Sequence, residues 1–171
     1  MEQNSPMPEP RERTEKERGR EPQGDASEMM EAGEAARAEE SGAEGLDPRV
    51  VVALRAASDK KALDPVVLDL REVASFTDFF VIVSATNVRQ VQAIADEIQE
   101  QLRKESGARP ARVEGYRSAE WVLLDYGDFI FHVFEEKSRR FYDLERLWRD
   151  AARVSLPPEL AGGESSLRSE R

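Results

Sequence analysis

The stretch "SAEWVLLDYGDFIFHVFEEKSRRFYDLERLW", residues 118–148, decides the fold of this chain and contains both of its tryptophans and its only histidine. Two apolar runs flank a Tyr-Gly pair, a pattern that predicts a β-hairpin with its turn at Tyr126-Gly127. A helix should follow with Ser138 as its N-cap, and its apolar positions are Phe141, Leu144, Leu147 and Trp148. The stretch therefore predicts two antiparallel strands and a last helix.

The two faces of this hairpin differ in composition. Side chains alternate across a strand, so placing Asp125 opposite Asp128 sorts them into two sets. The core set is wholly apolar: Val122, Leu124, Phe129, Phe131 and Val133. The mixed set is Trp121, Leu123, Asp125, Asp128, Ile130, His132 and Phe134. An apolar centre with charged margins is typical of a protein-binding patch. Cover by the last helix would also explain the mixed face, and the pattern alone leaves both interpretations open.

Outward from the hairpin, the apolar pattern predicts the rest of the domain. A helix should begin at Asp47-Pro48, and strands should follow over 64–70 and 79–85. A second helix should start at Thr86 or Asn87 and end at Ser106, before Gly107, and a short strand should follow over 111–115. This order predicts the α/β class: a single domain with a mixed β-sheet of about five strands packed by helices.

Composition sets the expected limits of this domain. Residues 1–47 contain six Lys or Arg against fourteen Asp or Glu and no aromatic residue, which predicts a disordered acidic N-terminal extension. Residues 48–160 contain 17 basic and 19 acidic side chains, and this near-neutral balance argues against a broad phosphate-binding surface. We expect the domain over 48–155 and a flexible tail over 156–171.

Few residues in the chain suit catalysis. The absence of cysteine excludes disulfides and thiolate metal sites, and neither a GxGxxG nor a Walker A pattern occurs. His132 is the only imidazole, and aspartates such as Asp125 and Asp128 are common in turns for local backbone reasons. We therefore expect no enzyme: no catalytic residue, no metal site and no cofactor.

The apolar runs are also too short to span a bilayer, and the acidic start lacks the features of a signal or transit peptide. The expectation is a cytoplasmic protein with no membrane contact.

Five segments, in this order, resemble the ribosomal silencing factor family, also called RsfS or Iojap-like. They are "DKKALDPVVLDL", "SFTDFFVIVSATNVRQVQAIADEI", "VEG", "AEWVLLDYGDFIFHVF" and "RRFYDLERLW", and they span about Val50 to Trp148. Each segment alone is a weak signal, whereas the series is specific, above all the Trp…D-x-G-D…HVF hairpin.

The resemblance implies a domain similar to nucleotidyltransferases but without their activity, and the chain lacks the Gly-Ser and D-x-D residues that such enzymes use. It implies binding to ribosomal protein L-fourteen on the intersubunit face of the large ribosomal subunit. A factor bound there sterically blocks joining of the small subunit and represses translation when nutrients are scarce. The alternatives are a large-subunit assembly factor, which would share the same docking surface, and a nucleotidyltransferase-like enzyme.

The resemblance also implies that the mixed face of the hairpin is the docking surface. Trp121 is then the expected anchor, and acidic groups at the margin should receive basic side chains of the ribosomal protein. The expected partner-binding residues are Glu114, Trp121, Leu123, Asp125, Tyr126, Asp128, Ile130, His132 and Phe134. No direct sequence-specific nucleic acid binding is expected, and an exposed Trp patch would favour a homodimer when the protein is free.

Overall fold

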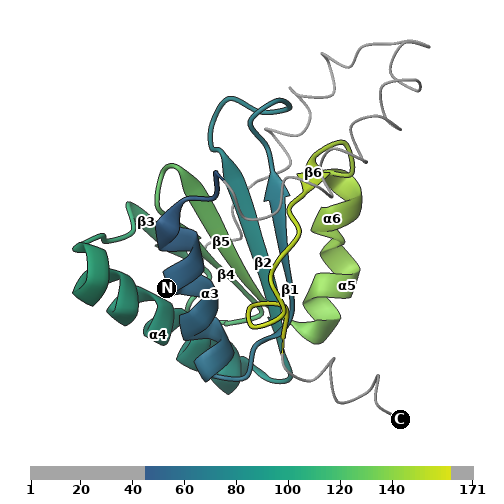
Figure 1. Ribbon diagram of the computed structural model, residues 1–171. Coiled ribbons are helices and arrows are strands. Elements are labelled where there is room, and N and C mark those ends of the chain that lie inside the picture. Colours follow the sequence, from purple (N-terminus) through teal and green to yellow (C-terminus); the bar gives the residue numbers. More distant parts are fainter. Residues whose placement is uncertain (1–44, 163–171) are drawn as a thin grey trace.

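A six-stranded mixed sheet organises residues 45–162, the part of the chain that this computed structural model describes (Figure 1). The strands are β1 (Leu63–Asp69), β2 (Phe79–Ala85), β3 (Arg112–Glu114), β4 (Trp121–Asp125), β5 (Phe129–Glu135) and β6 (Ala152–Arg153). Their spatial order is β3-β4-β5-β2-β1-β6, with β2 and β5 parallel and the other neighbours antiparallel. The predicted mixed sheet is confirmed, and β6 is an additional strand of two residues, too short to leave a sequence pattern.

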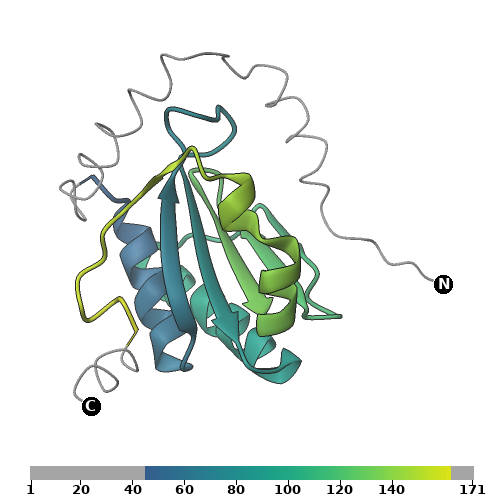
Figure 2. The same ribbon diagram turned by 90° about the vertical axis from the view of Figure 1, so that its right-hand side faces the viewer.

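Helices cover both faces of the sheet. They are α3 (Pro48–Asp59), α4 (Val88–Ser106), α5 (Glu136–Tyr142) and α6 (Leu144–Leu147). α3 and α4 lie on one face, and α5 and α6 lie on the other, as Figure 2 shows from the α5 side. Asp47 and Asn87 cap α3 and α4 through side-chain oxygens that accept backbone N–H groups, and Gly107 ends α4 with a φ of 71°. These three predicted helix signals are confirmed.

Each face of the sheet buries its own apolar cluster. The α3–α4 cluster includes Val50, Ile94, Leu102, Val122 and Phe131, and the α5–α6 cluster includes Leu70, Phe80, Trp121, Leu144 and Trp148. The central strand β2 is buried along its whole length because it contributes side chains to both clusters. The hairpin β4–β5 likewise faces two cores and not one core and solvent.

The last helix differs from its prediction. α5 begins at Glu136, because the side chain of Glu135 and not that of Ser138 caps it, accepting the backbone N–H of Lys137 at 3.2 Å. Asp143 has a φ of 49° and separates α5 from α6. The single helix that the sequence predicts is therefore divided into two short helices.

Packing extends beyond the predicted domain limits at both ends. Leu46 and Leu160 are 8 % and 4 % exposed and belong to the α3–α4 cluster, although they lie outside the expected range 48–155. The segment after β6 runs back along the α3 side of the molecule (Figure 1). Most of the predicted acidic extension, residues 1–44, and the end of the predicted tail, residues 163–171, lie outside the described residues.

Candidate functional site

The β4–β5 hairpin turns one residue later than predicted. The backbone N–H of Tyr126 donates to the carbonyl of Phe129 at 3.0 Å, so Gly127-Asp128 form the turn. The strand pairing therefore differs from the expected one by two residues: Trp121 lies opposite Phe134. An even shift leaves every strand residue on its predicted face, because side chains alternate with a period of two.

The mixed face of the hairpin is buried. Its central side chains are each at most 6 % exposed: Trp121, Leu123, Ile130, His132 and Phe134. Leu144 and Trp148 pack against this face within the α5–α6 cluster. The alternative in which the last helix covers this face is therefore the correct one. The expectation of an exposed patch with Trp121 as its anchor is wrong, and with it the stated reason for a homodimer is lost.

Trp121 and His132 form the polar centre of this buried face. The indole Nε1 of Trp121 donates to Nδ1 of His132 at 3.0 Å, so the imidazole proton lies on Nε2. Phe80 contacts the imidazole edge-on at 4.5 Å between ring centroids, and Phe134 stacks on the indole at 4.8 Å. Burial lowers the pKa of His132 to about 3. The imidazole is therefore neutral near pH 7 and enclosed among aromatic rings, which is the setting of a structural histidine.

Tyr126 lies on the opposite side of the sheet from the predicted patch. It is 8 % exposed, belongs to the α3–α4 cluster and stacks on Phe129 with centroids 5.1 Å apart. Burial raises the pKa of Tyr126 to about 12. Tyr126 is therefore not exposed at the turn tip, and its contribution to docking stays a prediction.

Three predicted acidic residues do lie at the surface. Glu114 and Asp125 both contact Arg112, at 3.2 and 3.3 Å, and Asp128 contacts Arg49 at 2.9 Å with its side chain 68 % exposed. We call Glu114, Asp125 and Asp128 the acidic margin. Exposed ion pairs of this kind contribute at most about 1 kcal/mol, so a basic partner can displace or share them at little cost.

An exposed aromatic surface lies directly over the buried mixed face. Phe141, Tyr142 and Leu147 are 80 %, 42 % and 41 % exposed, and we call these three residues the α5–α6 surface. The ring of Tyr142 lies 4.8 Å from that of Trp121, and Phe141 meets Tyr142 edge-on at 5.0 Å. Apolar side chains grouped in this way on a surface are typical of a protein-binding site.

Helical periodicity assigned Phe141 and Leu147 to the buried side of one continuous helix. The left-handed residue Asp143 redirects the chain, so that Leu144 and Trp148 face inward and Phe141 faces out. Asp is one of the few non-glycine residues that adopt this conformation readily, so Asp143 is the feature of the sequence that indicates a break in the helix.

Arg139 fixes the position of the α5–α6 surface. Its guanidinium donates from Nη1 to the Asp64 carbonyl and to the Ser84 hydroxyl, both at 2.8 Å, and from Nη2 to Glu145 at 2.7 Å. These bonds tie α5 to β1, β2 and α6, and the Arg139 side chain is only 11 % exposed. These bonds hold the α5–α6 surface in one conformation before a partner binds. Binding therefore costs less conformational entropy.

Within residues 45–162, no three His, Asp or Glu side chains come together as a potential metal site. In the same part of the chain, no helix combines the length and the apolar character needed to cross a membrane.

Comparison with known proteins places the chain in a family. The family model described as "Ribosomal silencing factor during starvation" matches residues 43–170. The "Ribosomal silencing factor RsfS" of Halalkalibacterium halodurans is 43 % identical over 105 residues, which cover 61 % of this chain and 89 % of the relative. The protein of the same name from Bacillus subtilis is 41 % identical over 105 residues, covering 61 % and 88 %.

A solved structure supports the same assignment. The crystal structure of a protein from Chromobacterium violaceum superimposes with a TM-score of 0.57 and 36 % identity, over 59 % of this chain and 83 % of the other. The structural and the sequence comparisons therefore agree with each other. The chain belongs to the ribosomal silencing factor family.

Proposed function

We propose that this protein binds the large ribosomal subunit through ribosomal protein L-fourteen, blocks joining of the small subunit and so represses translation when nutrients are limited. The observation that carries the proposal is the family match over residues 43–170. Volume exclusion at a shared interface needs neither a reaction nor a cofactor, so the protein acts as a regulator and not as an enzyme. Its place of action is the cytoplasm, where ribosomes assemble.

The α5–α6 surface together with Glu114 and Asp125 is the proposed contact with ribosomal protein L-fourteen. Glu114 pairs with Leu123 across β3–β4, so both lie on the sheet face that α5 and α6 cover. The resulting arrangement is an apolar aromatic centre beside acidic groups, which suits a basic partner. Of the buried residues of the mixed face, Trp121 and Phe134 are in ring contact with Tyr142, at 4.8 and 6.5 Å between centroids, and support its position. Arg112 holds the side chains of Glu114 and Asp125.

Sedimentation of purified ribosomal subunits tests the proposal. Wild-type protein should travel with large subunits and, when both subunits are mixed, should reduce the peak of joined ribosomes. An assembly factor without silencing activity would bind large subunits and leave the joined peak unchanged. Protein that stays at the top of the gradient in every mixture would contradict the proposed function.

Phe141→Ala should weaken this binding without affecting the fold. Truncation of an aromatic hot spot costs about 2 kcal/mol or more, which is roughly thirtyfold in affinity. The unfolding free energy should change by less than about 0.5 kcal/mol, because the side chain is 80 % exposed. Affinity for large subunits and urea denaturation of the same preparation measure the two effects.

Val88→Ala is the matched control for Phe141→Ala. Val88 is an exposed apolar side chain, 45 % accessible, at the start of α4 and thus on the opposite layer of the domain. The Val88→Ala substitution should leave binding to large subunits unchanged. If Phe141→Ala binds large subunits as tightly as the wild type does, the α5–α6 surface is not part of the contact. Silencing is tested separately, by the effect of the wild-type protein on the peak of joined ribosomes.

A further inference from the structure

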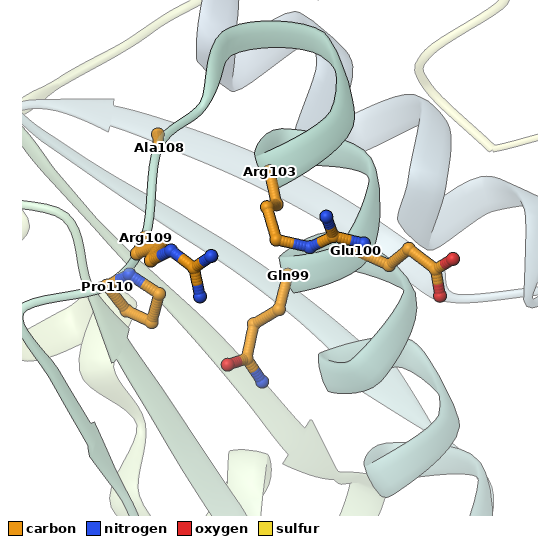
Figure 3. A pocket seen from close by; sticks show the side chains of 6 residues that line it. All are labelled: Gln99, Glu100, Arg103, Ala108, Arg109 and Pro110. Atoms are coloured by element: carbon orange, nitrogen blue, oxygen red, sulfur yellow. The ribbon is translucent and has the colours of Figure 1, made fainter.

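An open cleft lies where α4 ends and the chain turns toward β3. Its lining is Gln99, Glu100, Arg103, Ala108, Arg109 and Pro110 (Figure 3). Gln99, Glu100 and Arg103 come from the last turns of α4, and the other three come from the segment just after Gly107. Two arginine side chains from different segments thus border one space.

Neither arginine has an acidic partner of its own. Within residues 45–162, Arg49, Arg71, Arg112, Arg139 and Arg153 have acidic partners, whereas Arg103 and Arg109, like the other arginines of this part of the chain, have neither an ion pair nor a side-chain hydrogen bond. Arg103 and Arg109 both border the same cleft. Glu100, the carboxylate of the cleft, is engaged by Lys104 at 3.3 Å. Two uncompensated guanidinium groups therefore give this cleft a local positive charge on a domain that is otherwise almost neutral.

The backbone that carries Arg109 is fixed on both sides. The N–H groups of Gly107 and Ala108 donate to the carbonyls of Arg103 and Leu102 at 3.0 and 3.2 Å, and that of Ala111 donates to Asp125 at 2.7 Å. Pro110 adds rigidity, because a proline restricts both its own φ and the residue before it. The spacing between the two arginine backbones is therefore set by the fold before any ligand binds.

The position of the cleft links it to the proposed ribosome-binding surface. The Ala111–Asp125 bond joins its rim to an acidic-margin residue, and Arg112, next along the chain, contacts Glu114 and Asp125. A surface that docks on a ribosomal protein has ribosomal RNA next to it, and the exposed groups of folded RNA are mainly phosphates. Guanidinium groups suit phosphate because their planar N–H pairs match two of its oxygens.

We propose that Arg103 and Arg109 form a phosphate clamp for ribosomal RNA, a second contact of the protein with the large subunit beside the protein–protein contact. This inference rests on the proposed function, since the RNA it engages is that of the large subunit. The clamp binds backbone phosphates without reading base sequence. It strengthens binding and orients the factor about its protein contact.

The test uses the double variant Arg103→Gln/Arg109→Gln. Its control is the double variant Arg55→Gln/Arg89→Gln, which removes the same charge from exposed positions on α3 and at the other end of α4. Each full-length protein is titrated against purified large subunits at several salt concentrations, and against isolated ribosomal protein L-fourteen. Loss of the clamp should weaken subunit binding about tenfold near 0.1 M salt and lower the slope of log affinity against log salt by about one to two. Binding to the isolated protein should stay unchanged, and the control should match wild type in both assays.

Other outcomes would overturn the inference. Subunit affinity and salt slope equal to wild type would show that the two arginines contact no phosphate. An equal loss on the isolated ribosomal protein would place them in the protein contact instead. If the wild-type protein binds neither large subunits nor isolated ribosomal protein L-fourteen, the proposed function and the clamp are both contradicted. If only the clamp is wrong, the wild-type protein still binds both.

Discussion

Trp121→Ala should lower the free energy of unfolding by about 3–5 kcal/mol, so that the protein unfolds at a much lower urea concentration than the wild type. The indole is 2 % exposed, stacks on Phe134 and is covered by Tyr142, so its removal leaves a large cavity between the sheet and α5. Truncation of a buried tryptophan costs about 3–5 kcal/mol, a large part of the 5–15 kcal/mol that typically stabilises a domain. The change also leaves Nδ1 of His132 without its donor. Urea denaturation followed by far-UV circular dichroism measures the loss.

Phe141→Ala provides the comparison for Trp121→Ala. Both remove an aromatic ring from the same side of the sheet, but only the buried one should affect the free energy of unfolding. Loss of subunit binding by Trp121→Ala would then follow from loss of the fold, whereas loss by Phe141→Ala would report on the surface. A Trp121→Ala protein within 1 kcal/mol of the wild type would mean that the indole is accessible and that α5 does not cover it as described.

The sheet and its larger helices could be predicted because their patterns are local. The run 79–85 is apolar except for Ser84 because β2 is buried on both faces, and α4 shows a regular apolar stripe between the caps Asn87 and Gly107. β6 could not be predicted, because two residues carry no periodicity. The burial of Leu160 was missed for a related reason: a single leucine near the end of the chain packs through tertiary contacts that no local pattern encodes.

The hairpin faces were predictable in composition but not in exposure. Alternation separates Val122 from Trp121 correctly whichever turn is chosen, since a register change of two preserves the faces. Whether the mixed face is covered depends on how residues 136–148 pack over the sheet, and the left-handed residue Asp143 divides that segment into two helices. A mixed face with Trp and His fits a docking patch and a buried polar pair equally well, and the two differ only in what packs above them.

Acidification should destabilise the protein well above the pH at which its carboxylates titrate, because of His132. The pKa of this imidazole is lowered by burial to about 3 in the folded state, against 6.5 for an exposed histidine. As the pH falls below 6.5, the unfolded chain takes up a proton at this site while the folded chain does not, so unfolding becomes more favourable. Between pH 7.5 and pH 5 the expected loss is about 2 kcal/mol, at 1.36 kcal/mol per unit of pKa difference. The groups in ring contact with the imidazole, Phe80, Trp121 and Phe134, carry no charge that could offset this.

Urea denaturation at pH 7.5, 6.5, 5.8 and 5.0 measures this dependence, with His132→Asn as the control. The Asn side chain places an oxygen close to the position of Nδ1, so it can accept the Trp121 N–H and does not titrate. The variant should be less stable than the wild type at pH 7.5, because it loses ring packing, but its stability should change by less than about 0.5 kcal/mol down to pH 5. Carboxylates such as Asp47, whose pKa lies below the ordinary 3.8 mainly because Arg49 donates to it, stay ionised over this range and contribute equally to both proteins. A wild-type profile as flat as that of the variant would show that the imidazole gains a proton inside the fold, and the neutral Trp121–His132 pair would then be the wrong description of the centre beneath α5.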